Sequence, residues 1–246
     1  MTYELWNILD SLKSPKYKWV DLSYPVSAET PFWHRFNPLK AEEKFHFDPD
    51  GFRAIEYTVI SQYGTHVDPP CHFYSKGRNL DEIGLNEMVL PLCVIDAVEK
   101  TTTNCDYELT VDDIKEYEKT HGEIPAGCFV AMRTDWGERK YKTFDNHDDE
   151  GKAHYPGWSI DALKFLIETR KVTALGHETS DTDSAAAQEV HGAIGEYYVL
   201  EQGIYQIELL RNLKELPPKG AIIFCTWPNI KDGVGFTARC FACTPA

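Results

Sequence analysis

Residues 90–97 read LPLCVIDA and residues 127–134 read GCFVAMRT, two continuous apolar runs of strand length. Runs of this kind are typical of strands that are buried on both faces of a sheet. Between them, Thr110 and Asp113 have the spacing of a capping box, and Gly122 is a residue that ends helices. A helix is therefore expected between the two strands. The order of strand, helix and strand predicts an α/β fold.

The same alternation continues on both sides of this unit. Ser159 is expected to cap a second helix, whose apolar residues recur at helical spacing, and a further helix is expected around Tyr197–Leu200. Further strands are expected at Trp19–Tyr24, Ile55–Ser61, Val172–Leu175, Ile204–Leu209, Ala221–Thr226 and Phe236–Cys243. So many strands predict a mixed sheet that is curved or barrel-like and flanked by helices. We expect a single domain over residues 17–246, preceded by an N-terminal helical arm over residues 1–16.

Composition and charge exclude several classes of protein. Hydrophobic residues make up 42% and charged residues 26% of the 246 residues, which excludes a largely disordered chain. Lys plus Arg number 25 and Asp plus Glu 39, a net charge of -14 that argues against a nucleic-acid or anionic-membrane partner. The sequence shows no signal-peptide pattern and no run of 18 apolar residues. We expect a cytoplasmic protein with a small-molecule substrate.

The seven cysteines indicate reduced thiols. Their number is odd and most stand within apolar runs, so a disulfide framework is not expected. Cys240 and Cys243 form a lone C-x-x-C without a second pair of zinc ligands, and Cys225 is interpreted as buried packing. His147 and His154 stand in the acidic loop DNHDDEGKAH. That loop could bind a cation weakly, but a solvated loop is the preferred interpretation.

The segment most informative about chemistry is QYGTHVDPPCHF, residues 62–73. Side chains alternate along an extended chain, so His66, Asp68 and His72 share one side if the chain stays extended past Pro69 and Pro70. An imidazole and a carboxylate two residues apart are a pair suited to Zn²⁺ or Mn²⁺. The alternative is a turn whose polar residues are satisfied by hydrogen bonds. Two ligands alone do not complete a metal shell, and the residues themselves leave both interpretations open.

This segment resembles the signature of the cyclase family of metal-dependent hydrolases, which includes bacterial kynurenine formamidases and isatin hydrolases. The family pattern is H-x-G-T-H-x-D-x-P-x-H. The chain keeps Gly64, Thr65, His66, Asp68, Pro70 and His72, and it has Gln62 in place of the first His. A second family block is similar to EYYVLEQGIYQIELLRNL, residues 196–213. There Glu208 matches the acidic position, and Glu196 stands where the family has a His.

The resemblance implies His66, Asp68 and Glu208 as metal ligands, in a swivelling β/α-type, cyclase-like fold. Gln62 and Glu196 occupy the positions that bind in two-metal members of the family. They are either further ligands, or a hydrogen-bonding residue beside the site and a charge on a helix surface. We expect one divalent ion, Mn²⁺ or Zn²⁺, and leave a second ion open.

The resemblance also implies His72 as the catalytic histidine. An imidazole can take up and return a proton near neutral pH, as the leaving nitrogen of an amide requires. Substrate-binding candidates are Trp33, Phe73, His177 and Trp227, although the aromatic residues could equally be ordinary core or surface residues. Relatives of this kind suggest a homodimer or homotetramer.

Three functions follow from these observations. The first is a hydrolase that cleaves a carbon–nitrogen bond of a small amide or cyclic amide, such as an N-formyl arylamine or an isatin-like ring, by metal-activated water. The second is a lactone or ester hydrolase, or a cyclase or dehydratase, that uses the same site. The third is a small-ligand binding protein that kept the fold without catalysis, suggested by Gln62 and Glu196.

Overall fold

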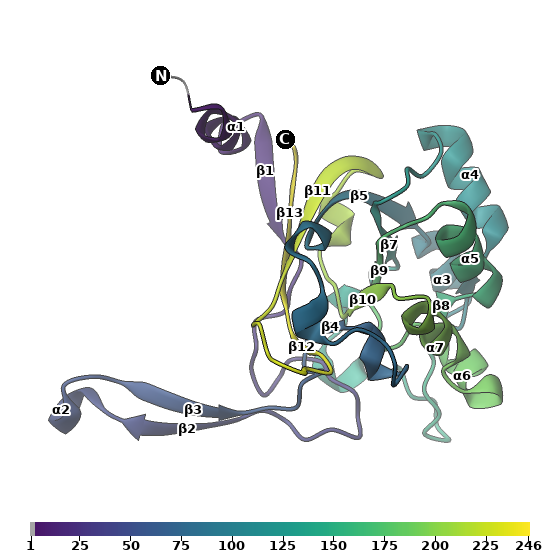
Figure 1. The fold of residues 1–246 in the computed structure, drawn as a ribbon. Helices are drawn as coiled ribbons and strands as arrows, with labels where there is room; N and C mark the ends of the chain where they lie inside the picture. Colours follow the sequence, from purple (N-terminus) through teal and green to yellow (C-terminus); the bar gives the residue numbers. More distant parts are fainter. Residues whose placement is uncertain (1–2) are drawn as a thin grey trace.

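The two apolar runs form neighbouring parallel strands, β5 (Val89–Asp96) and β7 (Phe129–Arg133), at the centre of one sheet. This arrangement is seen in a computed structural model that describes residues 3–246 (Figure 1). Alternate side chains enter two different cores: Leu92 and Val94 pack into one, while Cys93 and Ile95 pack into the other. The continuous apolar pattern therefore arises because both faces of these strands are covered.

The central sheet has nine strands, and its middle is parallel while its edges are antiparallel. Strands β5, β7, β9 (Ala174–His177) and β10 (Tyr205–Glu208) run parallel. The full order is β1 (Tyr17–Asp21), β13 (Arg239–Pro245), β11 (Lys219–Thr226), β5, β7, β9, β10, β4 (His66–Asp68) and β12 (Phe236–Thr237). The sheet curls into a half-barrel, which confirms the predicted mixed and curved α/β architecture (Figure 1).

Helices cover the outer face of the sheet (Figure 1). They are α3 (Val98–Thr103), α4 (Val111–His121), α5 (Ile160–Lys164), α6 (Ala185–His191) and α7 (Ile194–Glu201), and α5 continues as a π-helical segment over Phe165–Thr169. The capping box predicted at the start of α4 is present, because Thr110 and Asp113 exchange hydrogen bonds. Ser159 caps α5 as predicted. A small parallel pair, β6 (Glu108–Leu109) and β8 (Gly157–Trp158), lies beside these helices.

Two segments extend from the body of the domain. The antiparallel pair β2 (Lys40–Phe45) and β3 (Ala54–Thr58) projects as an arm with the short helix α2 (Phe47–Asp50) at its tip (Figure 1). The strand expected at Ile55–Ser61 thus exists, but it belongs to this arm and not to the central sheet. The expected N-terminal helix is α1 (Glu4–Leu12), and no residue of it is buried. Residues 1 and 2 of that expectation lie outside the described part.

The remaining expectations about cysteines and membranes can be compared directly. All seven cysteines are free, and Cys225 is fully buried in the inner core as expected. Within residues 3–246, no helix is long and apolar enough to cross a membrane.

Candidate metal centre

The pairing of β4 with β10 brings two distant segments of the chain together. The strands are antiparallel, with Glu208 opposite His66 and Gln206 opposite Asp68. Directly opposite residues point to the same face of a sheet, and residues two apart on one strand also share a face. All four side chains therefore gather on one side of this strand pair.

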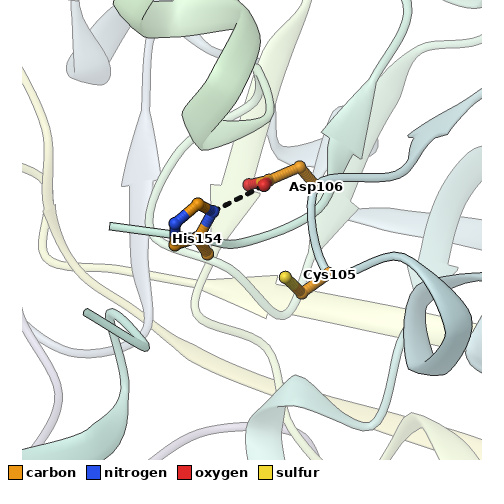
Figure 2. A group of neighbouring side chains, drawn as sticks. All are labelled: Cys105, Asp106 and His154. Carbon is orange, nitrogen blue, oxygen red and sulfur yellow. Dashed lines mark hydrogen bonds and ion pairs between the residues drawn. The ribbon is translucent and has the colours of Figure 1, made fainter. Parts of the chain in front are cut away.

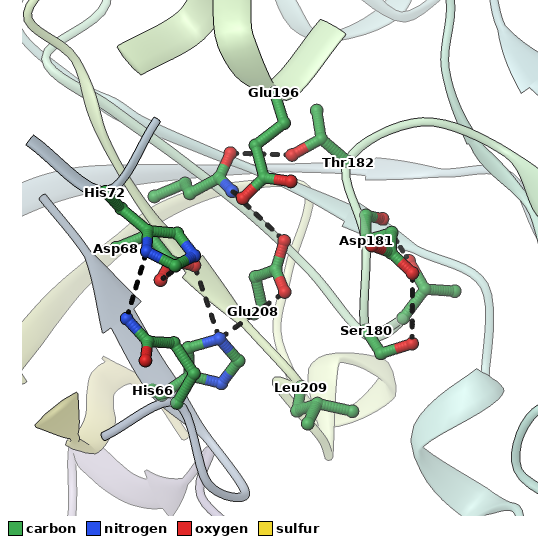
Figure 3. Close-up of polar contacts among 12 residues, drawn as sticks. His66, Asp68, His72, Ser180, Asp181, Thr182, Glu196, Glu208 and Leu209 are labelled. Carbon is green, nitrogen blue, oxygen red and sulfur yellow. Dashed lines mark hydrogen bonds and ion pairs between the residues drawn. The ribbon is translucent and has the colours of Figure 1, made fainter. Parts of the chain in front are cut away.

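Three of these side chains form a compact group of possible metal ligands (Figure 3). The Nε2 atom of His66 lies 3.3 Å from Oδ2 of Asp68 and 3.4 Å from Oε2 of Glu208. One donor atom from each of the three lies within 4.8 Å of the others, and all three residues are buried. The ligand set implied by the resemblance thus converges in space.

The turn before β4 fixes which nitrogen of His66 faces the group. Gly64 has φ +62°, and a Cβ atom there would lie 2.7 Å from the Thr30 methyl carbon, so glycine is required at this turn. The turn places the Gly64 carbonyl 2.7 Å from Nδ1 of His66. When Nδ1–H donates to that carbonyl, the lone pair of Nε2 points at the two carboxylates. This is the arrangement that orients a metal-binding histidine.

Thr65 joins both ligand strands through its hydroxyl group. The hydroxyl donates to the carbonyl of Leu209 at 2.6 Å and accepts from the backbone N–H of Tyr24 at 3.0 Å. Leu209, which follows Glu208, has a left-handed backbone with φ 55°. A leucine rarely adopts this conformation, and such strain persists only where surrounding contacts hold it. The Thr65 hydroxyl is one of these contacts.

The charges of the group favour a cation. Both carboxylate oxygens of Asp68 are buried and lack a hydrogen-bond partner among the described residues. Burial acts to lower the pKa of His66, but the carboxylates of Asp68 and Glu208 outweigh it and raise that pKa well above its usual value. Burial and the neighbouring carboxylates of Glu208 and Asp68 raise the pKa of Glu196 strongly. Unpartnered carboxylate oxygens beside an oriented imidazole fit a divalent cation.

Glu208 is held from behind by a chain of hydrogen bonds. The indole N–H of Trp158 donates to Nδ1 of His177 at 3.3 Å, so the proton of a neutral His177 stands on Nε2. That nitrogen lies 3.3 Å from Oε1 of Glu208, to which it donates. His177 itself is fully buried beside Glu208. Partners of this kind orient a metal-binding carboxylate.

Glu196 reaches the same group from the first turn of α7 (Figure 3). Asp183 accepts hydrogen bonds from the backbone N–H groups of Gly195 and Glu196 and so holds the start of this helix. The amide Nε2 of Gln206 donates to Oε1 of Glu196 at 3.1 Å and to Oε1 of Glu208 at 3.0 Å. Glu196 is thus a buried neighbour of the metal centre, linked to it through Gln206, rather than a surface charge.

Gln62 and His72 lie together at the other side of the group. Gln62 lies against Ser61, its Nε2 donates to the carbonyl of Val234 at 2.7 Å, and the same nitrogen lies 3.3 Å from Nδ1 of His72. Nε2 of His72 lies 3.7 Å from Oδ1 of Asp68. The chain does not stay extended past the prolines, because Pro70–His72 forms a 3₁₀ turn, so the condition for placing His72 by strand alternation is not met. That turn brings the His72 side chain back beside Asp68.

A pocket of about 390 Å³ opens above these residues. Trp33 and Phe73, two of the four residues proposed to bind substrate, line it, and Phe36 adds a third aromatic ring. Two other candidates lie elsewhere. His177 is buried beside Glu208, and Trp227 packs against Tyr205 with ring centroids 5.5 Å apart.

The sequence did not single out three further polar residues of the site. Gln206 bridges two glutamates, and Asp181 and Gln188 line the pocket. Asp181 is half-buried and accepts from the Tyr155 hydroxyl at 2.6 Å. Burial raises the pKa of Asp181 to about 7. The only signal in the sequence was for Gln206, which stands two residues before Glu208 on one strand and so shares its face.

Comparison with known proteins identifies relatives over most of the chain. A family model described as putative cyclase matches residues 20–184. Isatin hydrolase from Roseibium aggregatum is 34% identical over 209 residues, which cover 81% of this chain and 78% of that protein. Kynurenine formamidase from Geobacillus thermodenitrificans is 25% identical over 95 residues, 38% of this chain and 46% of that protein. The crystal structure of an isatin hydrolase bound to the product analogue thioisatinate superposes with a TM-score of 0.92 at 28% identity and covers 100% of both chains.

Proposed function

This chain belongs to the putative cyclase family, and from that premise we propose that it hydrolyses the carbon–nitrogen bond of a small aromatic amide or cyclic amide. The expectation of a hydrolase that acts on carbon–nitrogen bonds other than peptide bonds is confirmed by its isatin hydrolase and kynurenine formamidase relatives. The observation that carries the proposal is the convergence of His66, Asp68 and Glu208 in a buried corner of the pocket.

These three residues fit a divalent metal ion, which we take to be Mn²⁺ or Zn²⁺. One imidazole nitrogen and two carboxylate oxygens suit either ion. When bound, such an ion polarises a carbonyl group and makes water a stronger nucleophile. The Nε2 of Gln206 donates to both glutamates while its Oε1 accepts from Thr182, so Gln206 acts as a spacer between Glu196 and Glu208. This arrangement supports one ion rather than two.

His72 is the residue that we propose moves the proton. Its Nδ1 faces the amide of Gln62, so its orientation is held from the side away from the ligands. Its Nε2 faces Asp68 and the pocket, and is the atom placed to exchange a proton there. Because Gln62 donates to Nδ1, the neutral ring carries its proton on Nε2. This Nε2–H group gives its proton to the leaving nitrogen, and Nε2 takes back a proton from the water that adds to the substrate carbonyl. The ring thus begins and ends neutral.

The walls of the pocket support an aromatic substrate. The rings of Trp33, Phe36 and Phe73 offer flat apolar surfaces in the same pocket that His66 and Glu208 line. A volume of about 390 Å³ suits a molecule of one or two rings. The names of the relatives point in the same direction, towards isatin-like rings and N-formyl arylamines.

A substrate panel tests the proposal. Protein loaded with Mn²⁺ or Zn²⁺ is assayed against isatin, an N-formyl arylamine, an aromatic lactone and an aromatic ester. We expect the highest kcat/KM for one of the two amides, and we expect Asp68→Asn to lose both the bound metal and the turnover. Preference for the lactone or ester would favour the second function, and no turnover with metal bound would contradict a hydrolase.

We also propose that the protein assembles as a homodimer or homotetramer. Leu5 and Trp6 on α1 are 79% and 65% exposed, and Phe47 and Tyr57 on the projecting arm are 72% and 60% exposed. Large apolar side chains on two extended segments are typical of surfaces that are covered in an assembly. Sedimentation equilibrium measures the mass directly. A monomer at micromolar concentration would contradict this proposal.

A further inference from the structure

A second group of possible metal ligands lies outside the pocket (Figure 2). Cys105 and Asp106 follow helix α3, and His154 lies in the acidic loop that precedes β8. One sulfur, one carboxylate oxygen and one ring nitrogen of these residues lie within 4.8 Å of one another. The three side chains are half-buried, so they are both ordered by their surroundings and reachable from solvent.

The ring of His154 is oriented by carboxylates on both of its nitrogens. Its Nδ1 lies 2.6 Å from Oδ2 of Asp106, and its Nε2 lies 3.3 Å from Oδ2 of Asp148. Asp148 is itself fixed, because its other oxygen accepts from the backbone N–H groups of Glu150 and Lys152, each at 2.9 Å. The second oxygen of Asp106 is buried and lacks a hydrogen-bond partner among the described residues.

We propose that Cys105, Asp106 and His154 form a second metal site, which takes Zn²⁺ or a cation of similar softness. A thiolate with an imidazole and a carboxylate is a donor set suited to zinc, and water can complete a four-coordinate shell. Nδ1 of His154 binds the ion while its Nε2–H donates to Asp148, as second carboxylates do for metal-binding histidines. The Cys105 thiol releases its proton to solvent on binding.

The contact between His154 and Asp106 needs only a small adjustment to admit the ion. Ligand atoms about 2.0 Å from a tetrahedral ion lie ~3.3 Å apart, so the contact between His154 and Asp106 must open from 2.6 Å by less than an ångström. Of the cations near the group, Lys152 pairs with Glu189, and Arg139 stacks over the ring of Trp136 at 3.9 Å and donates to Asn146. Its guanidinium group is engaged on those partners and leaves the three ligands free to bind an ion.

A bound ion would cross-link two segments of the chain beside the pocket. It ties the turn after α3 to the loop that carries Tyr155, the residue next to His154 in the chain. Tyr155 donates to Asp181, and Asp181 lines the pocket. A bound ion therefore stiffens the segment that supports this wall. The acidic loop, first interpreted as solvated, becomes part of a structural metal site.

Cobalt substitution tests the site without relying on activity. Co²⁺ bound by a thiolate gives a charge-transfer absorption in the near ultraviolet, and the metal centre of His66, Asp68 and Glu208 offers no sulfur. We therefore expect this absorption in the wild-type protein. We expect Cys105→Ser to lose it and His154→Gln to weaken it, while Cys71→Ser, which removes another half-buried thiol, keeps it. Absence of the absorption at saturating Co²⁺, or its persistence in Cys105→Ser, would overturn the proposal.

A second measurement separates this site from the first centre. In an Asp68→Asn background, Zn²⁺ is expected to raise the melting temperature, because an ion that binds only the folded state stabilises it. Adding Cys105→Ser should abolish that rise, with equal melting temperatures of the two variants in chelator showing that the fold is intact. A rise in melting temperature that persists in the double variant would contradict a metal site at Cys105. Failure of the first centre alone would leave these results unchanged.

Discussion

Replacing Thr65 by valine removes one hydroxyl and keeps the shape of the side chain. The hydroxyl donates to the carbonyl of Leu209 and accepts from the N–H of Tyr24, and the residue is 1% exposed. Valine satisfies neither group. An unpaired buried backbone group costs about 1–3 kcal/mol. Because the Tyr24 contact is only partly buried, we expect Thr65→Val to lower the free energy of unfolding by about 2–4 kcal/mol.

The same substitution should also weaken metal binding. Thr65 precedes the ligand His66, and the carbonyl that it holds belongs to the residue after Glu208. Loss of a partner that orients metal ligands typically lowers affinity by about 10–100-fold. Urea unfolding in the presence of a chelator measures the stability change, and titration with Mn²⁺ or Zn²⁺ measures the affinity.

Thr65→Ser is the matched control, because serine keeps the hydroxyl and loses only a methyl group. We expect it to retain most of the metal affinity and to cost about 1 kcal/mol. The reasoning is refuted if Thr65→Val stays within about 0.5 kcal/mol of the wild type, or if serine and valine have equal effects.

Three further predictions concern the proton, the support of the metal ligand and the pH dependence of stability. His72→Ala should lower kcat by about 10²–10⁴-fold while the bound metal content stays unchanged, so loss of the metal would instead make His72 a ligand. Trp158→Phe removes the N–H that orients the His177 ring, and metal titration should show binding weakened by about 10–100-fold although no ligand is changed. Unchanged affinity would show that the hydrogen bonds from Trp158 through His177 do not support Glu208. Burial raises the pKa of Glu178 from 4.5 to about 7, so the stability contributed by its protonated form is complete below 4.5 and is lost as the pH rises through 7. Compared with Glu178→Gln, the wild type should therefore lose about 2–3 kcal/mol of unfolding free energy between about pH 5 and about pH 8, measured by urea unfolding. If the unfolding free energies of the two proteins change in parallel with pH, the Glu178 carboxyl group is not responsible.

Local sequence was sufficient where one segment determines its own structure. The apolar runs at 90–97 and 127–134 became central strands because both of their faces are covered, and Thr110 with Asp113 capped α4 as expected. The arm was partly missed, since four of the six residues of β2 (Lys40–Phe45) are charged and the strand is almost entirely exposed. Its only structural requirement is to pair with β3, which leaves little hydrophobic pattern to detect.

Within the site, sequence was informative about residues that stand close together in the chain. His66 and Asp68 stand two residues apart on one short strand, so extended geometry alone places their side chains on the same face. His72 reaches the same group for a different reason, because the 3₁₀ turn at Pro70–His72 reverses its direction. Proline restricts φ but does not dictate the turn, so this outcome needed the contacts with Gln62 and Asp68.

The sequence by itself determined the central strands, the capped helices, the short ligand motif and, through its resemblance to a family, the partner carboxylate at position 208. Tertiary structure alone decided the register between β10 and β4, and with it which β10 side chains lie beside His66 and Asp68. It thereby made Gln206 the bridge between two glutamates and placed His177 behind Glu208 instead of in the pocket. The reason is that strand register is a property of two segments far apart in the chain. A shift by one residue would turn Glu208 to the opposite face, and no local pattern encodes that choice.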